Sequence, residues 1–145
     1  MKQVSDIIRE FFEKYESSTN NLDLELLGSQ YSDSFMFASP QSTQAVKKDD
    51  FLKVLPKRQG FFKTIGLTSS TITMLEENQL DENYIMVKAY WNMCFEKADG
   101  QPIMDESSAT YILFQQGNIL QIVFQLDHQD LTKRAQELGL FPAKD

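Results

Sequence analysis

Two neighbouring ionisable residues near the end of the sequence, Asp127 and His128, are the clearest candidates for acid–base chemistry. A partly buried carboxylate has a raised pKa and can exchange a proton near neutral pH, and the imidazole of His128, the only histidine, titrates in the same range. The structural alternatives are that Asp127 caps a following helix and that His128 is an ordinary polar residue at a strand-to-helix junction. Adjacent strand residues point to opposite faces, so we expect only one of the pair to face a pocket, and the alternation favours His128.

A second group of candidates is mostly aromatic and could line a pocket for a small, mostly apolar molecule. The indole N–H of Trp91 and the hydroxyls of Tyr15, Tyr31 and Thr110 would supply its polar groups. We expect Trp91, Ile112 and Phe124 to project together into this space. The alternative is a filled core with a cavity below about 100 Å³, against roughly 300–1,000 Å³ for most ligand sites. The residues predicted to line the pocket are Phe11, Tyr15, Tyr31, Phe37, Trp91, Met93, Thr110, Ile112 and Phe124.

Composition narrows the classes of partner and cofactor. The chain has 145 residues, a length typical of one domain, and a net charge of -7, which argues against nucleic acid and anionic membranes. One cysteine and one histidine exclude an internal disulfide and a zinc site built from several such residues, so we predict no metal and no cofactor. A basic stretch between Lys47 and Lys63, which includes Arg58, is interpreted as a solvated helix face, with an anion partner as the alternative. No targeting segment is apparent, and the free Cys94 suits a reducing compartment, so we expect a cytoplasmic protein.

The periodicity of apolar residues predicts helices first and strands afterwards, which indicates an α+β fold in one domain over residues 1–145. Helices are predicted from Ser5 or Asp6 to about residue 17, over 22–30, over 48–59 with a kink or early end at Pro56, and over 129–138. A short strand at 35–37 and a loop over 38–47 lie between them. Four strands joined by hairpins, over about 62–77, 83–97, 105–116 and 118–127, form a curved antiparallel sheet covered by the N-terminal helices.

The alternation within these strands predicts which face meets the helices. Ile85, Trp91, Ile112, Phe124 and the residues in phase with them are placed inward. The other face keeps an apolar patch, and such patches usually mark an interface. We therefore predict a homodimer, while the alternative is that these residues merely suit half-exposed strands. The predicted patch comprises Met86, Tyr90, Tyr111, Leu113 and Val123.

Several segments together resemble a known superfamily. They are Asn20–Leu24, Phe35–Pro40, Phe114–Ile119 and the Gln-Glu-Leu-Gly-Leu run at 136–140. This order resembles the nuclear transport factor 2-like (NTF2-like) superfamily and, through the last segment, its SnoaL-like branch of polyketide cyclase relatives. The resemblance implies a cone of helices and bent sheet around a pocket.

The catalytic positions of that superfamily are mostly not matched. The acid and base positions of its ketosteroid isomerases fall on Phe11, Ser39 and Thr110, which argues against that chemistry. The polar pair that many SnoaL-like proteins carry in the last strand falls on Ile122 and Phe124. Asp127 resembles the acid–base aspartate of the cyclases. The leading hypothesis is a binding module for a small apolar molecule, and the alternative is a cyclase, isomerase or hydratase that uses Asp127 or His128 as general acid or base.

Overall fold

The computed structural model describes residues 4–140, so the first three and last five residues of the predicted domain lie outside the described part. Four long strands follow three helices and a short hairpin, which confirms the α+β class predicted from the sequence. The elements are α1 (Asp6–Asn21), α2 (Leu24–Gln30), β1 (Tyr31–Ala38), β2 (Thr43–Lys47), α3 (Lys48–Thr64), β3 (Leu67–Asp81), β4 (Tyr84–Glu96), β5 (Pro102–Gln116), β6 (Ile119–Asp127) and α4 (Leu131–Glu137).

The strands form one six-stranded sheet in the order β2-β1-β6-β5-β4-β3. Adjacent strands are antiparallel except β1 and β6, which run parallel. The sheet is therefore mixed, whereas a purely antiparallel sheet was predicted. The predicted loop over 38–47 also contains a strand, β2, which pairs with β1. Most β2 side chains are exposed, so this edge strand shows little of the apolar alternation on which the prediction depended.

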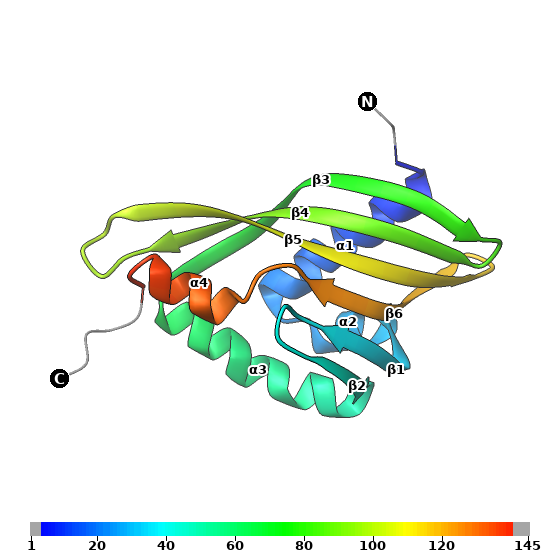
Figure 1. The fold of residues 1–145 in the computed structure, drawn as a ribbon, viewed down its shortest axis with the longest axis horizontal. Helices are drawn as coiled ribbons and strands as arrows, with labels where there is room; N and C mark the ends of the chain where they lie inside the picture. Colours follow the sequence, from blue (N-terminus) through cyan, green and yellow to red (C-terminus); the bar gives the residue numbers. More distant parts are fainter. Residues whose placement is uncertain (1–3, 141–145) are drawn as a thin grey trace.

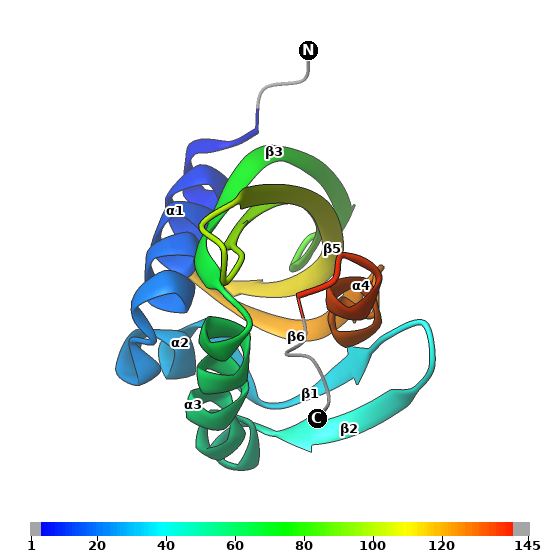
Figure 2. The same ribbon diagram turned by 90° about the vertical axis from the view of Figure 1, so that its left-hand side faces the viewer.

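The sheet is strongly bent, and the N-terminal helices cover its concave side (Figures 1 and 2). Ile8, Phe11, Phe12 and Tyr15 lie on the buried face of α1 and pack against inward residues of β4, β5 and β6. The three- and four-residue spacing of these side chains made the helix predictable. Asp23 caps the N-terminus of α2, and its carboxylate accepts a hydrogen bond from the Leu26 backbone N–H at 3.1 Å.

Helix α3 runs further than predicted. It continues through Pro56 and Gly60 to Thr64, and Gly66, with φ of 105°, follows its end. Phe62 lies in this extension and is buried in a second apolar cluster with Met93, Phe95 and Ala135. Burial of the Phe62 ring, roughly 1.5–3 kcal/mol, opposes the unfavourable contributions of the proline and glycine.

The strand β5 faces the opposite way from the prediction. The β4–β5 hairpin pairs Phe95 with Ile103 and Trp91 with Ser107, and directly paired residues share a face. The inward residues of β5 are therefore Asp105, Ser107, Ala109, Tyr111 and Leu113, whereas Thr110 and Ile112 point outward. Both faces of β5 carry apolar residues, so the hairpin register and not the hydrophobic pattern decides the orientation.

The strand β6 contains a bulge that reverses its alternation halfway. Leu113 of β5 pairs with Ile122, whereas the preceding residue, Ile112, pairs with Phe124, which leaves Val123 as an extra residue. Leu120 and Ile122 point inward before the bulge, as predicted. After it, Gln125 and Asp127 point inward, and Phe124 and His128 point outward. The prediction assumed unbroken alternation and was wrong for the second half of the strand.

The short helix α4 lies at one end of the bent sheet, beside β5 and β6 (Figure 2). The Arg134 guanidinium donates hydrogen bonds to both carboxylate oxygens of the buried Asp105 on β5, at 3.0–3.2 Å. This contact and the second apolar cluster fix α4 against the sheet. Within residues 4–140 no helix has the length and apolarity to cross a bilayer. The same residues contain no cluster of three side chains suited to bind a metal ion.

Candidate functional site

A cavity of about 190 Å³ lies between the helices α1 and α3 and the concave side of the sheet. This volume exceeds the limit of about 100 Å³ expected for a filled core and is smaller than the roughly 300–1,000 Å³ of most ligand sites. Its walls are mostly apolar, with Leu55 and Phe62 from α3 and Trp91 and Met93 from β4. Polar residues line it at two places: near the end of β6, with Gln125 and Asp127, and where α1 meets β3, with Asn20 and Ser70.

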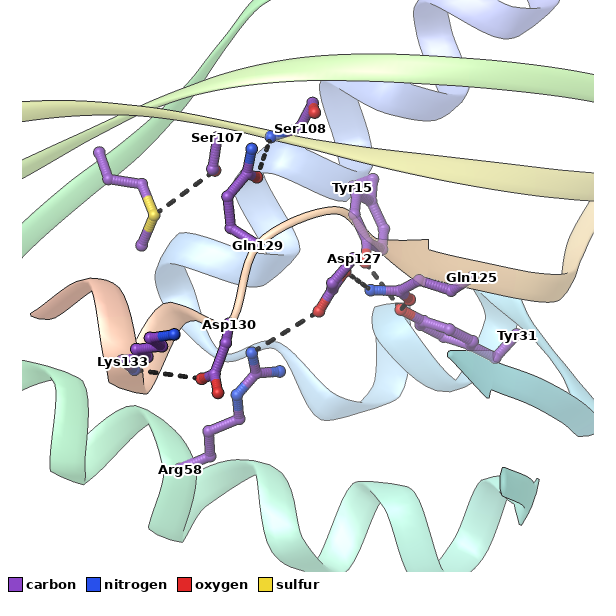
Figure 3. A network of polar contacts seen from close by, with 11 residues as sticks. Tyr15, Tyr31, Arg58, Ser107, Ser108, Gln125, Asp127, Gln129, Asp130 and Lys133 are labelled. Atoms are coloured by element: carbon purple, nitrogen blue, oxygen red, sulfur yellow. Dashed lines mark hydrogen bonds and ion pairs between the residues drawn. The ribbon is translucent and has the colours of Figure 1, made fainter. Parts of the chain in front are cut away.

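A chain of hydrogen bonds runs along the polar side near the end of β6 and ends on Asp127 (Figure 3). The Tyr31 hydroxyl donates to Oε1 of Gln125 at 2.6 Å, and Nε2 of Gln125 donates to Oδ1 of Asp127 at 3.0 Å. Because the Tyr31 proton is used in this way, its oxygen accepts from the Tyr15 hydroxyl, 2.7 Å away. The hydroxyls of Tyr15 and Tyr31 and the amide of Gln125 therefore all donate in the direction of Asp127. This chain of hydrogen bonds holds the Asp127 carboxylate in one orientation.

The carboxylate of Asp127 lies in the wall of the cavity, and its side chain is only 17% exposed. Burial raises its pKa above the ordinary value, while the Gln125 amide and the Arg58 guanidinium act in the opposite direction without cancelling the effect. The nearest Arg58 nitrogen is 3.9 Å from Oδ2, too far for a hydrogen bond. The result is a carboxyl group held firmly at one oxygen and loosely at the other, with a raised proton affinity.

The tyrosine hydroxyls around the cavity remain protonated at neutral pH. Burial raises the pKa of Tyr15, Tyr31 and Tyr111 above the ordinary value, and the negative charge of Asp127 raises each of them further. These phenols can therefore donate hydrogen bonds, but they cannot act as bases near pH 7.

Asp127 is not the cap of α4. That role belongs to Asp130, whose Oδ1 accepts a hydrogen bond from the Lys133 backbone N–H at 3.1 Å. The structural alternative for Asp127 proposed from the sequence is therefore wrong.

His128 lies on the outer face, contrary to the prediction that it points into the pocket. Its Nε2 is 2.7 Å from Oγ1 of Thr110, which faces the same way. Partial burial and the charge of Lys88 on the outer face lower its pKa. The β6 bulge is the reason, because it exchanges the directions of Asp127 and His128 relative to an unbroken strand.

The structure brings only part of the predicted pocket together. Tyr15, Tyr31, Trp91 and Met93 line the cavity. Phe11 is buried in the core beside Tyr15. Phe37 instead lines a second hollow of about 150 Å³, which shares Arg58 and Asp127 with the cavity.

Three predicted pocket residues lie on the opposite side of the sheet. Thr110, Ile112 and Phe124 point outward because of the β5 register and the β6 bulge. Of Trp91, Ile112 and Phe124, which were expected to project inward together, only Trp91 does so.

Sequence reasoning also missed residues that the structure places in the site. Gln125 and Arg58 connect to Asp127, and Tyr111 and Ser107 line the cavity. A polar Gln125 in an apolar strand, two residues before an aspartate, was the available signal for a local change of face.

The predicted dimer patch needs the same correction. Tyr111 and Leu113 are 2% and 0% exposed and belong to the core, so they cannot form an outer interface. Met86 and Tyr90 lie on the outer face as predicted, where they are half-buried. They are joined by Ile112 and Phe124.

No protein-family model and no curated protein sequence matches the chain. Solved structures match its fold. An NTF2-like protein of unknown function from Shewanella oneidensis gives a TM-score of 0.68 at 17% identity, over 86% of this chain and 98% of that one. Aln2 from a Streptomyces species gives 0.70 at 13% identity, over 92% and 99%.

A third structure bears on the fold class. An NTF2-like protein with a cystatin-like fold from Novosphingobium aromaticivorans gives a TM-score of 0.68 at 11% identity, over 94% of this chain and 87% of that one. At such identities the likeness concerns the fold, and it extends over most of both chains. The chain therefore has the fold of the NTF2-like superfamily, as the sequence resemblance predicted.

Proposed function

We propose that the cavity binds a small, mostly apolar molecule about as large as one six-membered ring with a polar substituent. A dry cavity of about 150 Å³ is known to hold benzene, so 190 Å³ is enough for a ring and a few further atoms. Apolar walls would supply most of the affinity. The hydrogen-bonded end at Asp127 would orient the polar substituent.

We further propose that Asp127 exchanges a proton with the bound molecule, as in a cyclase, isomerase or hydratase. The observation that carries this proposal is the placement of a largely buried carboxyl group, with a raised pKa, in the wall of an otherwise apolar cavity. Its Oδ1 is held by Gln125, so Oδ2 is the oxygen available to a reactant. The resemblance of Asp127 to the acid–base aspartate of SnoaL-like cyclases supports the same assignment.

Benzisoxazole tests the binding and the chemistry together. When a base removes the proton on C3, the C–H electron pair forms a nitrile, the N–O bond breaks, and the ring opens to 2-cyanophenolate, which is followed by its absorbance. A carboxylate base in an apolar cavity accelerates this reaction, and a positioned base typically contributes about 10²–10⁴-fold. We expect Asp127→Asn to lose most of the acceleration.

Asp130→Asn is the matched control. It removes the same charge from a nearby residue, and asparagine caps a helix about as well as aspartate, so both rate and stability should be retained. Equal rates for the wild type and Asp127→Asn would reject Asp127 as a base. If benzisoxazole nevertheless binds and competes with other ring compounds, the non-catalytic binding module becomes the better description.

We also propose a homodimer through the outer face of the sheet. Met86, Ile112, Phe124 and Met36 stand directly opposite one another on β4, β5, β6 and β1 and form one apolar row. The same face carries Lys88 together with Glu76 and Glu106, opposite charges that suit a surface that pairs with a copy of itself.

The mass in solution tests the dimer. Light scattering after gel filtration should give twice the chain mass for the wild type and the monomer mass for Ile112→Lys. Val54→Lys introduces the same charge on an exposed residue of α3 and should remain dimeric. A monomeric wild type at high micromolar concentration would reject the dimer.

A further inference from the structure

We propose that the molecule bound in the cavity carries an anionic oxygen group, such as a carboxylate, that pairs with Arg58. This inference rests on the proposed binding function and names the chemical class of its ligand: a small ring or branched hydrocarbon acid. Arg58 extends from α3 toward Asp127 at the polar side of the cavity (Figure 3).

The guanidinium of Arg58 has unused hydrogen-bonding capacity. Arginine carries five N–H donors in a planar fork. Within the described residues 4–140, this group makes only the 3.9 Å ion pair with Asp127 and a contact above the Phe62 ring, 5.5 Å from its centre. Neither contact is a hydrogen bond. The side chain is 41% exposed, so water now meets these donors and an entering anion can replace it.

The position of Arg58 fits an amphipathic acid. Arg58 and Asp127 line both the inner cavity and the second hollow of about 150 Å³. A ligand with its hydrocarbon part in the inner cavity would therefore place its charged group at the junction, where water still reaches. A carboxylate keeps part of its hydration there, so the desolvation cost that opposes binding of charge in an apolar cavity is reduced.

The local charge also favours an anion. The cavity is lined by two cations, Arg58 and Lys63, and one acidic residue, Asp127, although the whole chain carries a net charge of -7. A carboxylate can accept two parallel hydrogen bonds from a guanidinium, whereas Asp127 is placed too far away to do so.

A pair of nearly isosteric probes separates this inference from the proposed function. Benzoate and benzamide share one ring and differ in charge, and both are of a size suited to the cavity. The fluorescence of Trp91, the only tryptophan, reports occupation of the cavity because the indole lines it. We expect benzoate to bind at least about tenfold more tightly than benzamide at pH 7, the difference expected for charge-assisted hydrogen bonds.

Arg58→Gln should weaken benzoate binding by about tenfold or more and leave benzamide within about twofold. Lys57→Gln removes the same charge from the adjacent exposed position, which lines neither hollow, and should change neither affinity by more than about twofold. Asp127→Asn, which removes the neighbouring acidic group, should bind benzoate at least as tightly as the wild type. Thermal unfolding of each variant confirms that it is folded.

The outcomes are distinct. Equal affinities of the wild type for the two probes, or an Arg58→Gln variant that still prefers benzoate, would overturn the anionic-ligand inference and leave the proposed binding function intact. If neither probe binds, the proposed function fails and this inference fails with it. If Lys57→Gln weakens benzoate as strongly as Arg58→Gln, the effect is one of general charge and the assignment to Arg58 is wrong.

Discussion

The hydroxyl of Tyr31 holds the polar side of the cavity together, and its removal is a quantitative test of the structure. Tyr31 is 1% exposed, and its hydroxyl both donates to Gln125 and accepts from Tyr15. Tyr31→Phe keeps the ring and its packing against Phe35 and Phe51 but removes both hydrogen bonds. Gln125, itself 6% exposed, is left with an acceptor that has lost its donor.

The expected loss follows from these two bonds. A buried neutral hydrogen bond contributes about 0.5–1.5 kcal/mol net, so two contribute about 1–3 kcal/mol to the free energy of unfolding. Removal of one partner, which leaves a buried acceptor unpaired, favours the upper half of this range. In a domain of this size, 1 kcal/mol shifts the melting temperature by roughly 2–4 °C, so we expect a decrease of about 4–12 °C.

Urea and thermal unfolding measure this loss, and Tyr84→Phe is the matched control. Tyr84 is 41% exposed and contacts Phe114 through its ring, so loss of its hydroxyl should change the free energy of unfolding by less than about 0.5 kcal/mol. If Tyr31→Phe is no more destabilising than Tyr84→Phe, the hydrogen-bonded chain to Asp127 does not exist as described.

Three further perturbations test separate parts of the structure. Burial raises the pKa of Asp127 in the folded state, so this residue contributes stability below its ordinary pKa of 3.8 that is lost as the pH rises through the raised value. In urea titrations, the free energy of unfolding of Asp127→Asn minus that of the wild type should therefore grow with pH over this interval. A pH-independent difference would contradict the raised pKa. At Gly66, whose φ is 105°, an added Cβ would overlap the carbonyl oxygen of Glu96, whereas one at Gly117 meets open space. Gly66→Ala should therefore lower the free energy of unfolding by about 3–4 kcal/mol and Gly117→Ala by only about 1–2 kcal/mol. Equal losses would show that the Gly66–Glu96 approach is not tight. Asp130→Ala should cost about 0.5–2 kcal/mol through loss of the α4 cap, and an unchanged melting curve would argue against that cap.

The parts of the fold that the sequence made predictable are those in which one local signal dominates. The spacing of Phe11, Phe12 and Tyr15 defines one face of α1, and the turn at Gly117 defines the last hairpin. The strand β4 alternates without interruption from Ile85 to Phe95, and the structure buries every residue predicted to point inward. In these elements a wrong register or period would expose large apolar side chains to water.

The candidate site was harder to predict because two non-local features control it. On β5, the apolar residues Tyr111 and Ile112 lie on opposite faces, so only the hairpin pairing through Phe95 and Ile103 decides which one is buried. On β6, the single extra residue Val123 decides whether Asp127 or His128 faces the cavity. The prediction that one member of the pair faces the cavity favoured the wrong member, since the bulge carries no glycine or proline that would reveal it.

The extension of α3 beyond its predicted end was also controlled by a non-local contact. Pro56 and Gly60 are local signals for an end, and they were outweighed by burial of Phe62 against β4, a contact that no local pattern records. The same extension presents Lys63 to the cavity, beside Arg58 from the predicted part of the helix. A helix that ended at residue 59 would have left only Arg58 there.

The location of a bound probe tests the central claim most directly. Nuclear Overhauser effects between the ring protons of benzoate and the protein identify the side chains in contact with it. The structure predicts contacts with the Trp91 indole and the Met93 methyl group, both of which line the cavity. Contacts confined to Ile112 or Phe124 on the outer face, or no contact with Trp91 at a saturating concentration of benzoate, would contradict a ligand site beside Asp127.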